Sequence, residues 1–365
     1  MGQHPSKRTT SLSRRRFARL SLLGFGATVA GPLSPVSGRQ DTGFREGRTG
    51  EVPEGAAALV DDRTIRAIDD GLSWLTANQA PDGSYGSGSY RAAISSLAGL
   101  AFMGNGSSPG RGPYGGSIDE ALGYVMSCAD ASGFVSSPPP SNNPMYGHGF
   151  ATLFLAEAYG MSRRSELRPI LERAVRLIID TQNEEGGWRY QPVRDDADLS
   201  VTICQINALR AARNAGLFVP KETVEECIEY VNQAQNPDGG FRYMLRGGSS
   251  AFPRSAAGVV ALYSAAVYND QAVDDGIEYL KQHRPDDRFL RRLPHYFYGH
   301  YYAAQAMWIR GGDDWNRWYP AIRDELLNDQ EPDGSWSDGF GPAYGTAMAL
   351  IILQLPFSCL PIFQR

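Results

Sequence analysis

The stretch TQNEEGGWRY, residues 181–190, returns in altered form as NQAPDGSYGS (78–87), AQNPDGGFRY (234–243) and DQEPDGSWSD (329–338). Each copy has Gln, a short acidic or proline-containing turn, Gly and then an aromatic residue. The Gln residues are Gln79, Gln182, Gln235 and Gln330, Gln282 begins a copy without the Gly-aromatic tail, and Ala129 replaces Gln in a degenerate copy. These positions follow one another at intervals of 47 to 53 residues, which predicts a sixfold repeat.

Each repeat contains two helical patterns that flank this signature. The segment before it, such as LERAVRLIIDTQ (171–182), has apolar residues three and four apart and charges on the other face. The segment after it, such as DLSVTICQINALRAARNAG (198–216), is apolar on most faces and rich in small residues. Because one helical hairpin leaves its apolar face uncovered, the hairpins must stack. The sequence predicts an all-α (α/α)6 toroid with an inner and an outer ring of helices.

The signature itself has a structural interpretation. Its glycines supply the positive φ that a tight turn between two helices needs. The aromatic residue is large enough to pack against a neighbouring hairpin, and the Gln amide suits the unpaired backbone groups at helix ends. We therefore predict that the signature fastens each hairpin rather than binding a ligand.

Composition narrows the class of protein. The 365 residues are 42% hydrophobic, which is enough for a large core. The net charge is −5, and it is −11 without the six basic residues of 1–38, so an acidic body argues against nucleic acid as a partner. The four cysteines, Cys128, Cys204, Cys227 and Cys359, include no CxxC pair, and we expect buried apolar side chains rather than metal ligands.

The N-terminus has the pattern of an export signal. SRRRFAR (13–19) precedes the apolar run LSLLGFGATVAGPL (20–33), which resembles the bacterial twin-arginine signal for export of folded proteins. We expect a signal segment at 1–38, a flexible linker at 39–60 and the toroid at 61–365. The protein would then be periplasmic or in the cell envelope, with the signal either removed or kept as a tether, and no integral membrane domain in the mature body.

The repeats resemble the QW repeats of the prenyltransferase and squalene/oxidosqualene cyclase superfamily over about residues 61–355, most closely its exported single-toroid bacterial members. The cyclases of that superfamily carry a DxDD motif whose third residue protonates the substrate. Here the matching place reads Asp196-Ala197-Asp198-Leu199, so the resemblance implies Asp198 as the acid and Asp196 as its neighbour, with the fourth Asp missing. The residues alone offer another interpretation, because an Asp before an apolar helix commonly caps it.

The resemblance extends only partly to the zinc-dependent protein prenyltransferases. Their metal is held by an Asp-x-Cys pair and a later His, and this sequence has no Asp-x-Cys. We expect neither a metal site nor a cofactor.

The start of every inner helix would lie at the same end of the ring and line its opening. The ligand-binding residues predicted there are aromatic, acidic or basic: Tyr146, His148, Asp195, Arg254, His295, Tyr298, His300, Tyr301 and Tyr344. Three functions stay open. The first is an exported toroid that binds a hydrophobic or small-molecule ligand, or an envelope protein; the second is a squalene-type terpene cyclase or isomerase with Asp198 as general acid; the third is a carbohydrate-active toroid.

Overall fold

The computed structural model describes residues 56–286 and 294–364, and this part of the chain forms helices and connecting turns. The predicted signal segment (1–38) and most of the predicted linker lie outside the described residues. The last residues of that linker form the short helix η1 (Ala56–Leu59), which packs against the outer helix α12. This short helix, which lies within the predicted linker, therefore packs against the toroid.

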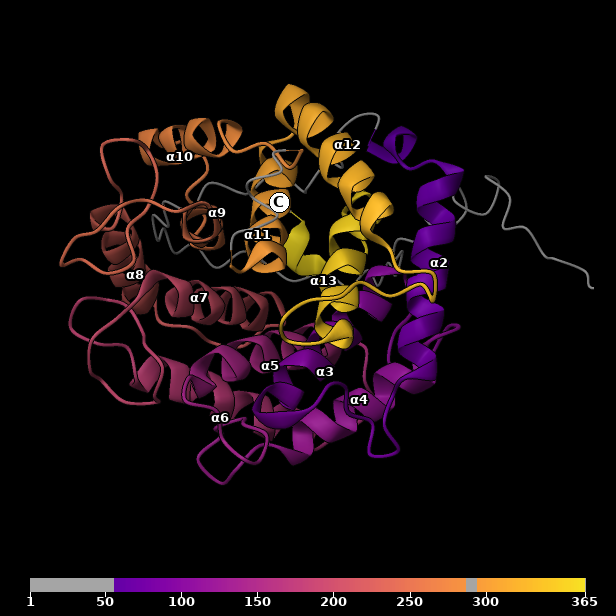
Figure 1. Cartoon of the computed structure of the whole chain (residues 1–365). Helices are drawn as coiled ribbons and strands as arrows, with labels where there is room; N and C mark the ends of the chain where they lie inside the picture. The colour runs from indigo at the N-terminus through magenta and orange to yellow at the C-terminus, as the bar shows by residue number, and fades with distance from the viewer. Residues whose placement is uncertain (1–55, 287–293, 365) are drawn as a thin grey trace, which may run out of the picture. The chain divides into compact units, whose positions relative to one another are not determined.

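Twelve α-helices of the described residues alternate between two rings (Figure 1). The outer helices are α2 (Asp62–Ala77), α4 (Gly115–Ser127), α6 (Leu167–Asp180), α8 (Lys221–Gln233), α10 (Gln271–Lys281) and α12 (Gly312–Asp329). The inner helices are α3 (Arg91–Gly104), α5 (Pro144–Tyr159), α7 (Leu199–Asn214), α9 (Phe252–Ser264), α11 (Tyr296–Arg310) and α13 (Pro342–Gln354). The predicted all-α toroid of six hairpins is confirmed.

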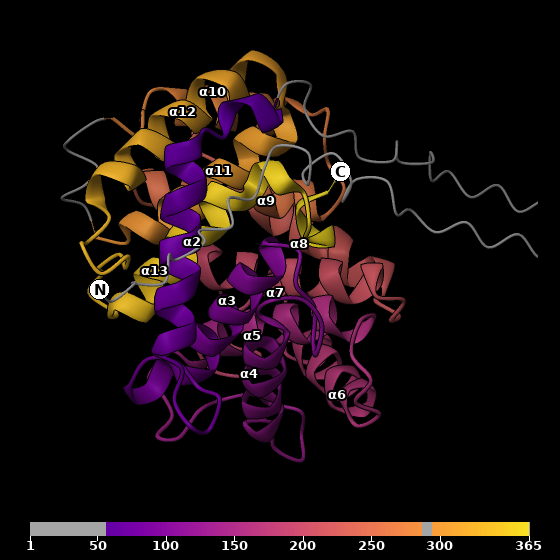
Figure 2. The ribbon, with the colours of Figure 1, turned by 90° about the vertical axis from the view of Figure 1, so that its right-hand side faces the viewer.

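The inner ring is closed. Each inner helix packs against the next in the order α3, α5, α7, α9, α11 and α13, and α13 packs against α3. Figure 2 shows α2 beside α12 and α13, where the last hairpin meets the first. The inner helices are buried on nearly every side, whereas each outer helix buries one face, as their residue patterns predict.

The signature Gln residues fasten successive hairpins. Each side-chain Nε2 donates to the Gly carbonyl of its own turn at 2.8–3.0 Å and to a carbonyl of the next outer helix at 2.8–2.9 Å. The partners in the next helix are Ser117 for Gln79, Thr223 for Gln182, Ala272 for Gln235 and Ala67 for Gln330. Gln330 thus joins the last hairpin to α2 and closes the ring.

The turn glycines satisfy two demands at once. Gly186 has φ +89°, and a Cβ there would lie 2.2 Å from the Glu226 carbonyl oxygen of α8. The signature aromatics Tyr85, Trp188, Phe241 and Trp336 are at most 1% exposed. The predicted structural role of the signature is therefore confirmed.

The C-terminal segment covers the end of the ring at which the inner helices finish. Helix α13 leads into η4 (Leu355–Phe357) and η5 (Pro361–Phe363), and η5 packs against α7 and α11. Trp308 Nε1 donates to the Phe363 carbonyl at 2.9 Å, and an Arg210 guanidinium nitrogen donates to the Gln364 carbonyl at 2.8 Å. Among the described residues, the centre of the ring is therefore open at the end where the inner helices begin.

Candidate functional site

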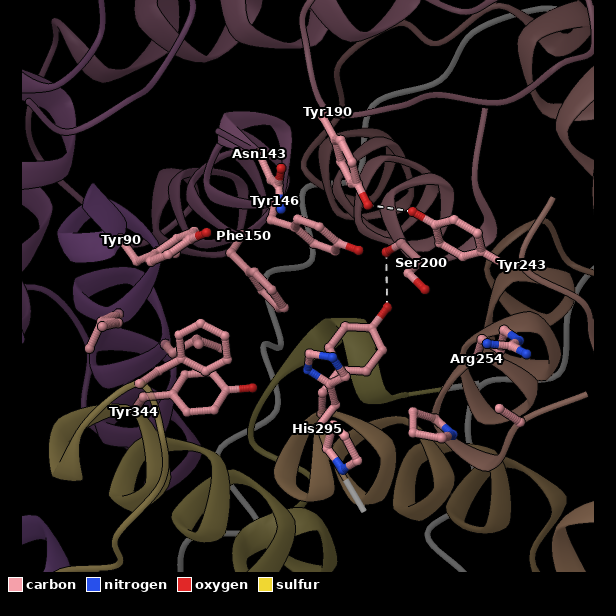
Figure 3. Close-up of a pocket in the computed structure, with 18 residues that line it drawn as sticks. Tyr90, Asn143, Tyr146, Phe150, Tyr190, Ser200, Tyr243, Arg254, His295 and Tyr344 are labelled. Atoms are coloured by element: carbon pink, nitrogen blue, oxygen red, sulfur yellow. Dashed lines mark hydrogen bonds between the residues drawn. The ribbon is translucent and has the colours of Figure 1, made fainter. Parts of the chain in front are cut away.

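A cavity of about 550 Å³ lies where the six inner helices begin. Figure 3 shows its wall, to which residues at the start of every inner helix contribute. The apolar part of the wall comes from Ala93, Ile94, Leu97, Phe150, Ala251, Pro253, Pro294 and Phe340. The polar and aromatic part comes from Tyr90, Asn143, Tyr146, Tyr190, Ser200, Tyr243, Arg254, His295, Tyr298 and Tyr344.

Five of the residues predicted at the opening lie on this wall: Tyr146, Arg254, His295, Tyr298 and Tyr344. Their shared position follows from the fold, because every inner helix starts at the same end of the ring. Binding of a ligand by these residues stays a prediction.

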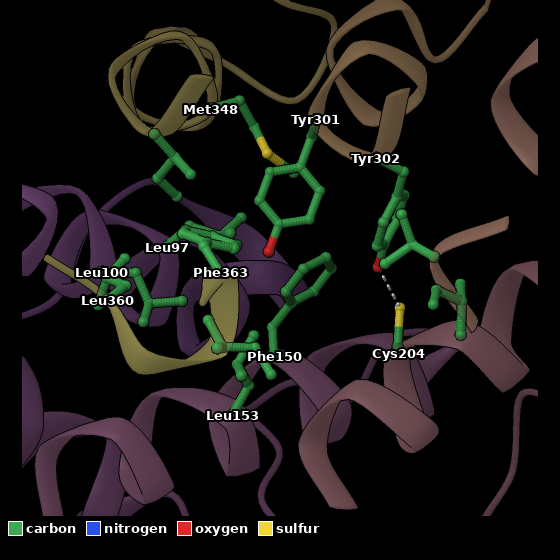
Figure 4. Packing of buried hydrophobic residues seen from close by; sticks show 14 of the residues in the cluster. Leu97, Leu100, Phe150, Leu153, Cys204, Tyr301, Tyr302, Met348, Leu360 and Phe363 are labelled. Atoms are coloured by element: carbon green, nitrogen blue, oxygen red, sulfur yellow. Dashed lines mark hydrogen bonds between the residues drawn. The ribbon is translucent and has the colours of Figure 1, made fainter. Parts of the chain in front are cut away.

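The other four predicted residues lie elsewhere. Asp195 is on an exposed loop. Tyr301 is buried below the cavity, where its ring packs near Phe150 and Phe363 (Figure 4). His148 and His300 are 0% exposed and face the outer ring, where His148 contacts the Ala174 carbonyl of α6 and the His300 ring lies 6.4 Å from that of Trp318 in α12, so neither reaches the wall.

His148 has a structural task. Its Nδ1 accepts from the Val135 backbone N–H at 3.1 Å, so its Nε2 carries the proton and donates to the Ala174 carbonyl at 3.2 Å. In four other repeats a hydroxyl receives the equivalent backbone N–H: Ser95, Thr202, Ser255 and Thr346. Burial lowers the pKa of His148 to about 4, which keeps it neutral. His148 therefore fastens the repeat that lacks the signature Gln.

Arg254 and His295 bring positive or protonatable groups to the wall. Arg254 Nε donates to the Phe241 carbonyl at 3.0 Å and a terminal nitrogen donates to the Ser249 carbonyl at 2.5 Å, so backbone contacts fix the guanidinium. His295 precedes α11 with φ +67°, in the left-handed region that non-glycine residues seldom occupy. Such a conformation directs its imidazole toward the cavity (Figure 3). Backbone strain of this kind is typical of functional sites.

Asp198 caps α7, as the alternative interpretation predicted. Its Oδ1 accepts from the Val201 backbone N–H at 2.9 Å, and its Oδ2 accepts from the Tyr243 hydroxyl at 3.2 Å. Arg189 Nε is 3.9 Å from Oδ2. Burial raises the pKa of Asp198 to about 6, against the lowering effect of the Val201 amide, the Tyr243 hydroxyl and Arg189. Asp198 lies behind the cavity wall rather than on it.

The second predicted acid, Asp196, forms an ion pair with Arg189, the same residue that lies beside Asp198. It contacts the Arg189 guanidinium, and a second cation, Arg246, lies 3.6 Å from the same oxygen. The pKa of Asp198 is raised by burial, and Asp196 is not among the causes of the shift. Catalysis by either residue stays a prediction.

Sequence reasoning missed two wall residues near Asp198: Tyr243, whose hydroxyl contacts its carboxyl, and Tyr190, which contacts Tyr243. Each follows the aromatic of a signature by two positions, in Trp188-Arg189-Tyr190 and Phe241-Arg242-Tyr243. Their hydroxyls contact each other, and Arg189 lies 5.0 Å from the centre of the Tyr190 ring. The repeated aromatic-Arg-Tyr pattern was the signal that could have identified them.

Across the described ranges, no group of three His, Cys, Asp or Glu residues is arranged to hold a metal ion. Within the same ranges, none of the helices combines the length and the apolar character needed to cross a bilayer.

Comparison with known proteins places this geometry in context. No model of a known protein family matches the chain. Two drimenyl diphosphate synthases match part of it, from Streptantibioticus cattleyicolor with 30% identity over 115 residues and from Streptomyces showdoensis with 29% over 127 residues. These matches cover 32% and 34% of this chain but only 21% and 23% of the relatives.

Solved structures match much more of the chain. The type II terpene cyclase MstE from Scytonema superimposes with a TM-score of 0.54 and 14% identity over 82% of this chain and 99% of that one. Cellobiose 2-epimerase from Spirochaeta thermophila gives a TM-score of 0.61 and 12% identity over 83% of this chain and 97% of that one. At such identities the likeness shows the fold alone. Together with the sequence relatives, the matches are consistent with the prenyltransferase and cyclase-like superfamily.

Proposed function

We propose that the chain binds an elongated, mainly apolar ligand of the terpenoid class in the cavity at the mouth of the ring. The observation that carries the proposal is the cavity itself, whose volume of about 550 Å³ falls in the range of small-molecule sites, roughly 300–1,000 Å³. Apolar side chains such as Ile94, Leu97 and Phe150 suit a hydrocarbon chain, and Tyr243, Arg254 and His295 suit a polar end.

The relatives support the choice of ligand class. One solved neighbour is a variant of MstE in complex with its substrate geranylgeranyl dihydroxybenzoate, with a TM-score of 0.53, and the sequence relatives are named for a terpenoid product. We extend that class of ligand to this chain because its cavity combines a large apolar wall with a few polar groups.

Binding is tested by filling the cavity. Ala93→Trp puts a bulky ring on the wall, and Phe218→Trp, on a side chain that is 82% exposed, is the matched control. Isothermal titration with the C15 hydrocarbon farnesene should show binding by the native protein and by Phe218→Trp, and at least about tenfold weaker binding by Ala93→Trp. Equal affinities of the two variants, with both folded by circular dichroism, would refute the proposed site.

A second candidate is a terpene cyclase or isomerase in which Asp198 is the general acid. The observation in its favour is the buried carboxyl with a pKa raised by burial to about 6, which keeps part of it protonated near neutral pH. Leu199 in place of the fourth Asp, and the separation of Asp198 from the cavity by Tyr243, weigh against it. The test is product analysis after incubation of the native protein and of Asp198→Asn with squalene and shorter isoprenoids. Products that form only with the native protein would support the cyclase, and no turnover by the native protein would refute it.

A carbohydrate-active role has less support. Glycoside hydrolysis generally needs two carboxylates that face one cleft. None of the described residues on the cavity wall is Asp or Glu.

Export through the twin-arginine route is a further part of the proposal and rests on Arg14, Arg15 and Phe17 of the N-terminal sequence. In a bacterial host, Arg14→Lys with Arg15→Lys should retain the protein in the cytoplasm. An envelope protein is the alternative occupant of the mouth of the ring. Binding of farnesene in the titration would favour the terpenoid ligand, and failure of farnesene to bind would favour the protein partner.

A further inference from the structure

Two tyrosines of the cavity wall connect it to the buried Asp198. The Tyr243 hydroxyl donates to Asp198 Oδ2 at 3.2 Å, and the hydroxyls of Tyr190 and Tyr243 are in direct contact. Figure 3 shows the two hydroxyls meeting at the edge of the cavity. Tyr190 and Tyr243 line the cavity, whereas Asp198 lies behind them with 0% exposure.

The direction of these hydrogen bonds depends on the charge of the carboxyl, because each phenol has only one proton. When Asp198 is ionised, Tyr243 donates its proton to the carboxylate, so Tyr190 must donate to Tyr243. The Tyr190 oxygen then has only lone pairs left for a ligand.

Protonation of Asp198 permits the opposite direction. Oδ1 accepts the Val201 amide proton, so the acid proton belongs on Oδ2, which faces Tyr243. The carboxyl then donates to the Tyr243 oxygen, Tyr243 donates to Tyr190, and the Tyr190 proton becomes available to a ligand.

We propose that Asp198, Tyr243 and Tyr190 form a hydrogen-bond chain whose end, the Tyr190 hydroxyl, binds the oxygen of the ligand's polar end. It accepts from an alcohol when the carboxyl is ionised and donates to a carbonyl when the carboxyl is protonated. The inference rests on the proposed binding of a terpenoid in this cavity and adds the chemistry of the group that is recognised.

Within the hydrogen-bond chain, the Asp198 carboxyl is the group that changes charge near neutral pH. Arg189 is a permanent cation, and its charge is also shared with Asp196. Burial raises the pKa of four neighbouring groups on α5, α7, α8 and α11 well above neutrality: Tyr146, Cys204, Tyr230 and Tyr298. Tyr243 is likewise neutral, since burial raises its pKa. The change of direction therefore follows the Asp198 carboxyl, near pH 6.

The chain can be tested without a ligand. Carbon-13 NMR of the Asp198 carboxyl, assigned with Asp198→Asn, gives its titration in the native protein and in Tyr243→Phe. Because the ionised carboxyl loses a donor in Tyr243→Phe, we expect its midpoint to rise by about one pH unit. Tyr146→Phe, on the same wall, should shift it by less than about 0.3 pH unit. Equal midpoints in the native protein and Tyr243→Phe would overturn the chain.

The ligand arm uses farnesol, farnesal and farnesene, which share a carbon skeleton of similar size and differ in the oxygen. At pH 8 the native protein should bind farnesol about tenfold more tightly than farnesene, and at pH 5 farnesal should gain about as much. Tyr190→Phe should bind all three alike at both pH values. A farnesol preference that persists in Tyr190→Phe would refute recognition by this hydroxyl. Failure of farnesene itself to bind would refute the proposed function, and the NMR titration would then test the hydrogen-bond chain by itself.

Discussion

The energetic cost of burying Asp198 gives the sharpest prediction for this structure. Asp198→Asn removes the charge while keeping the shape of the side chain. Asn is as good a helix N-cap as Asp, so the hydrogen bond from the Val201 backbone N–H to Oδ1 is retained. The new amide can donate to the Tyr243 oxygen, so the substitution isolates the charge.

The magnitude follows from the two pKa values of the carboxyl. Burial raises the pKa of Asp198 from 3.8 to about 6 in the folded protein, so the native state binds more protons than the unfolded state between these values. Stability from this group therefore falls as pH rises from 3.8 to 6 and is constant above that range. At 1.36 kcal/mol per pH unit the ionised carboxyl costs about 3 kcal/mol at pH 7.

Urea unfolding of both proteins at pH 5, 6, 7 and 8 measures this cost. The difference in unfolding free energy, Asp198→Asn minus native, should grow by about 1.5 kcal/mol from pH 5 to pH 8. Subtraction removes the contribution of every other titrating group. A difference that stays constant with pH, or that shrinks as pH rises, would show that the carboxyl is not held at a raised pKa and would remove the basis for both a general acid and a change of direction near pH 6.

Two further predictions concern the ring itself. Gln330→Ala removes the hydrogen bond to the Ala67 carbonyl across the junction of the last and first hairpins and the bond to the Gly334 carbonyl of its own turn, and should lower the unfolding free energy by about 2 kcal/mol. Gln282→Ala, on an exposed side chain, should change it by less than about 0.5 kcal/mol, and equal losses in urea unfolding would contradict the fastening role. Glu157→Gln should flatten the pH dependence of thermal unfolding between pH 5 and 7, because burial raises the pKa of Glu157 to about 7 and its ionisation costs stability as pH rises; an unchanged slope would refute this.

The repeat could be predicted from the sequence because each of its features depends on residues close together in the chain. The glycine turn, the amphipathic outer helix and the apolar inner helix of each unit are specified within about fifty residues, and one unit predicts the next. The six-hairpin ring and the cap formed by Asp198 were predictable for this reason, since a helix N-cap depends on a few consecutive residues. The position of all the inner-helix starts at one opening of the ring could be predicted for the same reason.

Which side chains face the cavity was decided only by the tertiary structure. His148 and His300 face the outer helices α6 and α12, and Tyr243, from the turn before α9, lies between Asp198 and the cavity. The residues that meet there lie 45 to 53 positions apart, in successive repeats. Local pattern fixes what each helix is, but the rotation of neighbouring helices and the path of the turns between them decide which of their first residues reach the centre, and those depend on packing across the whole ring.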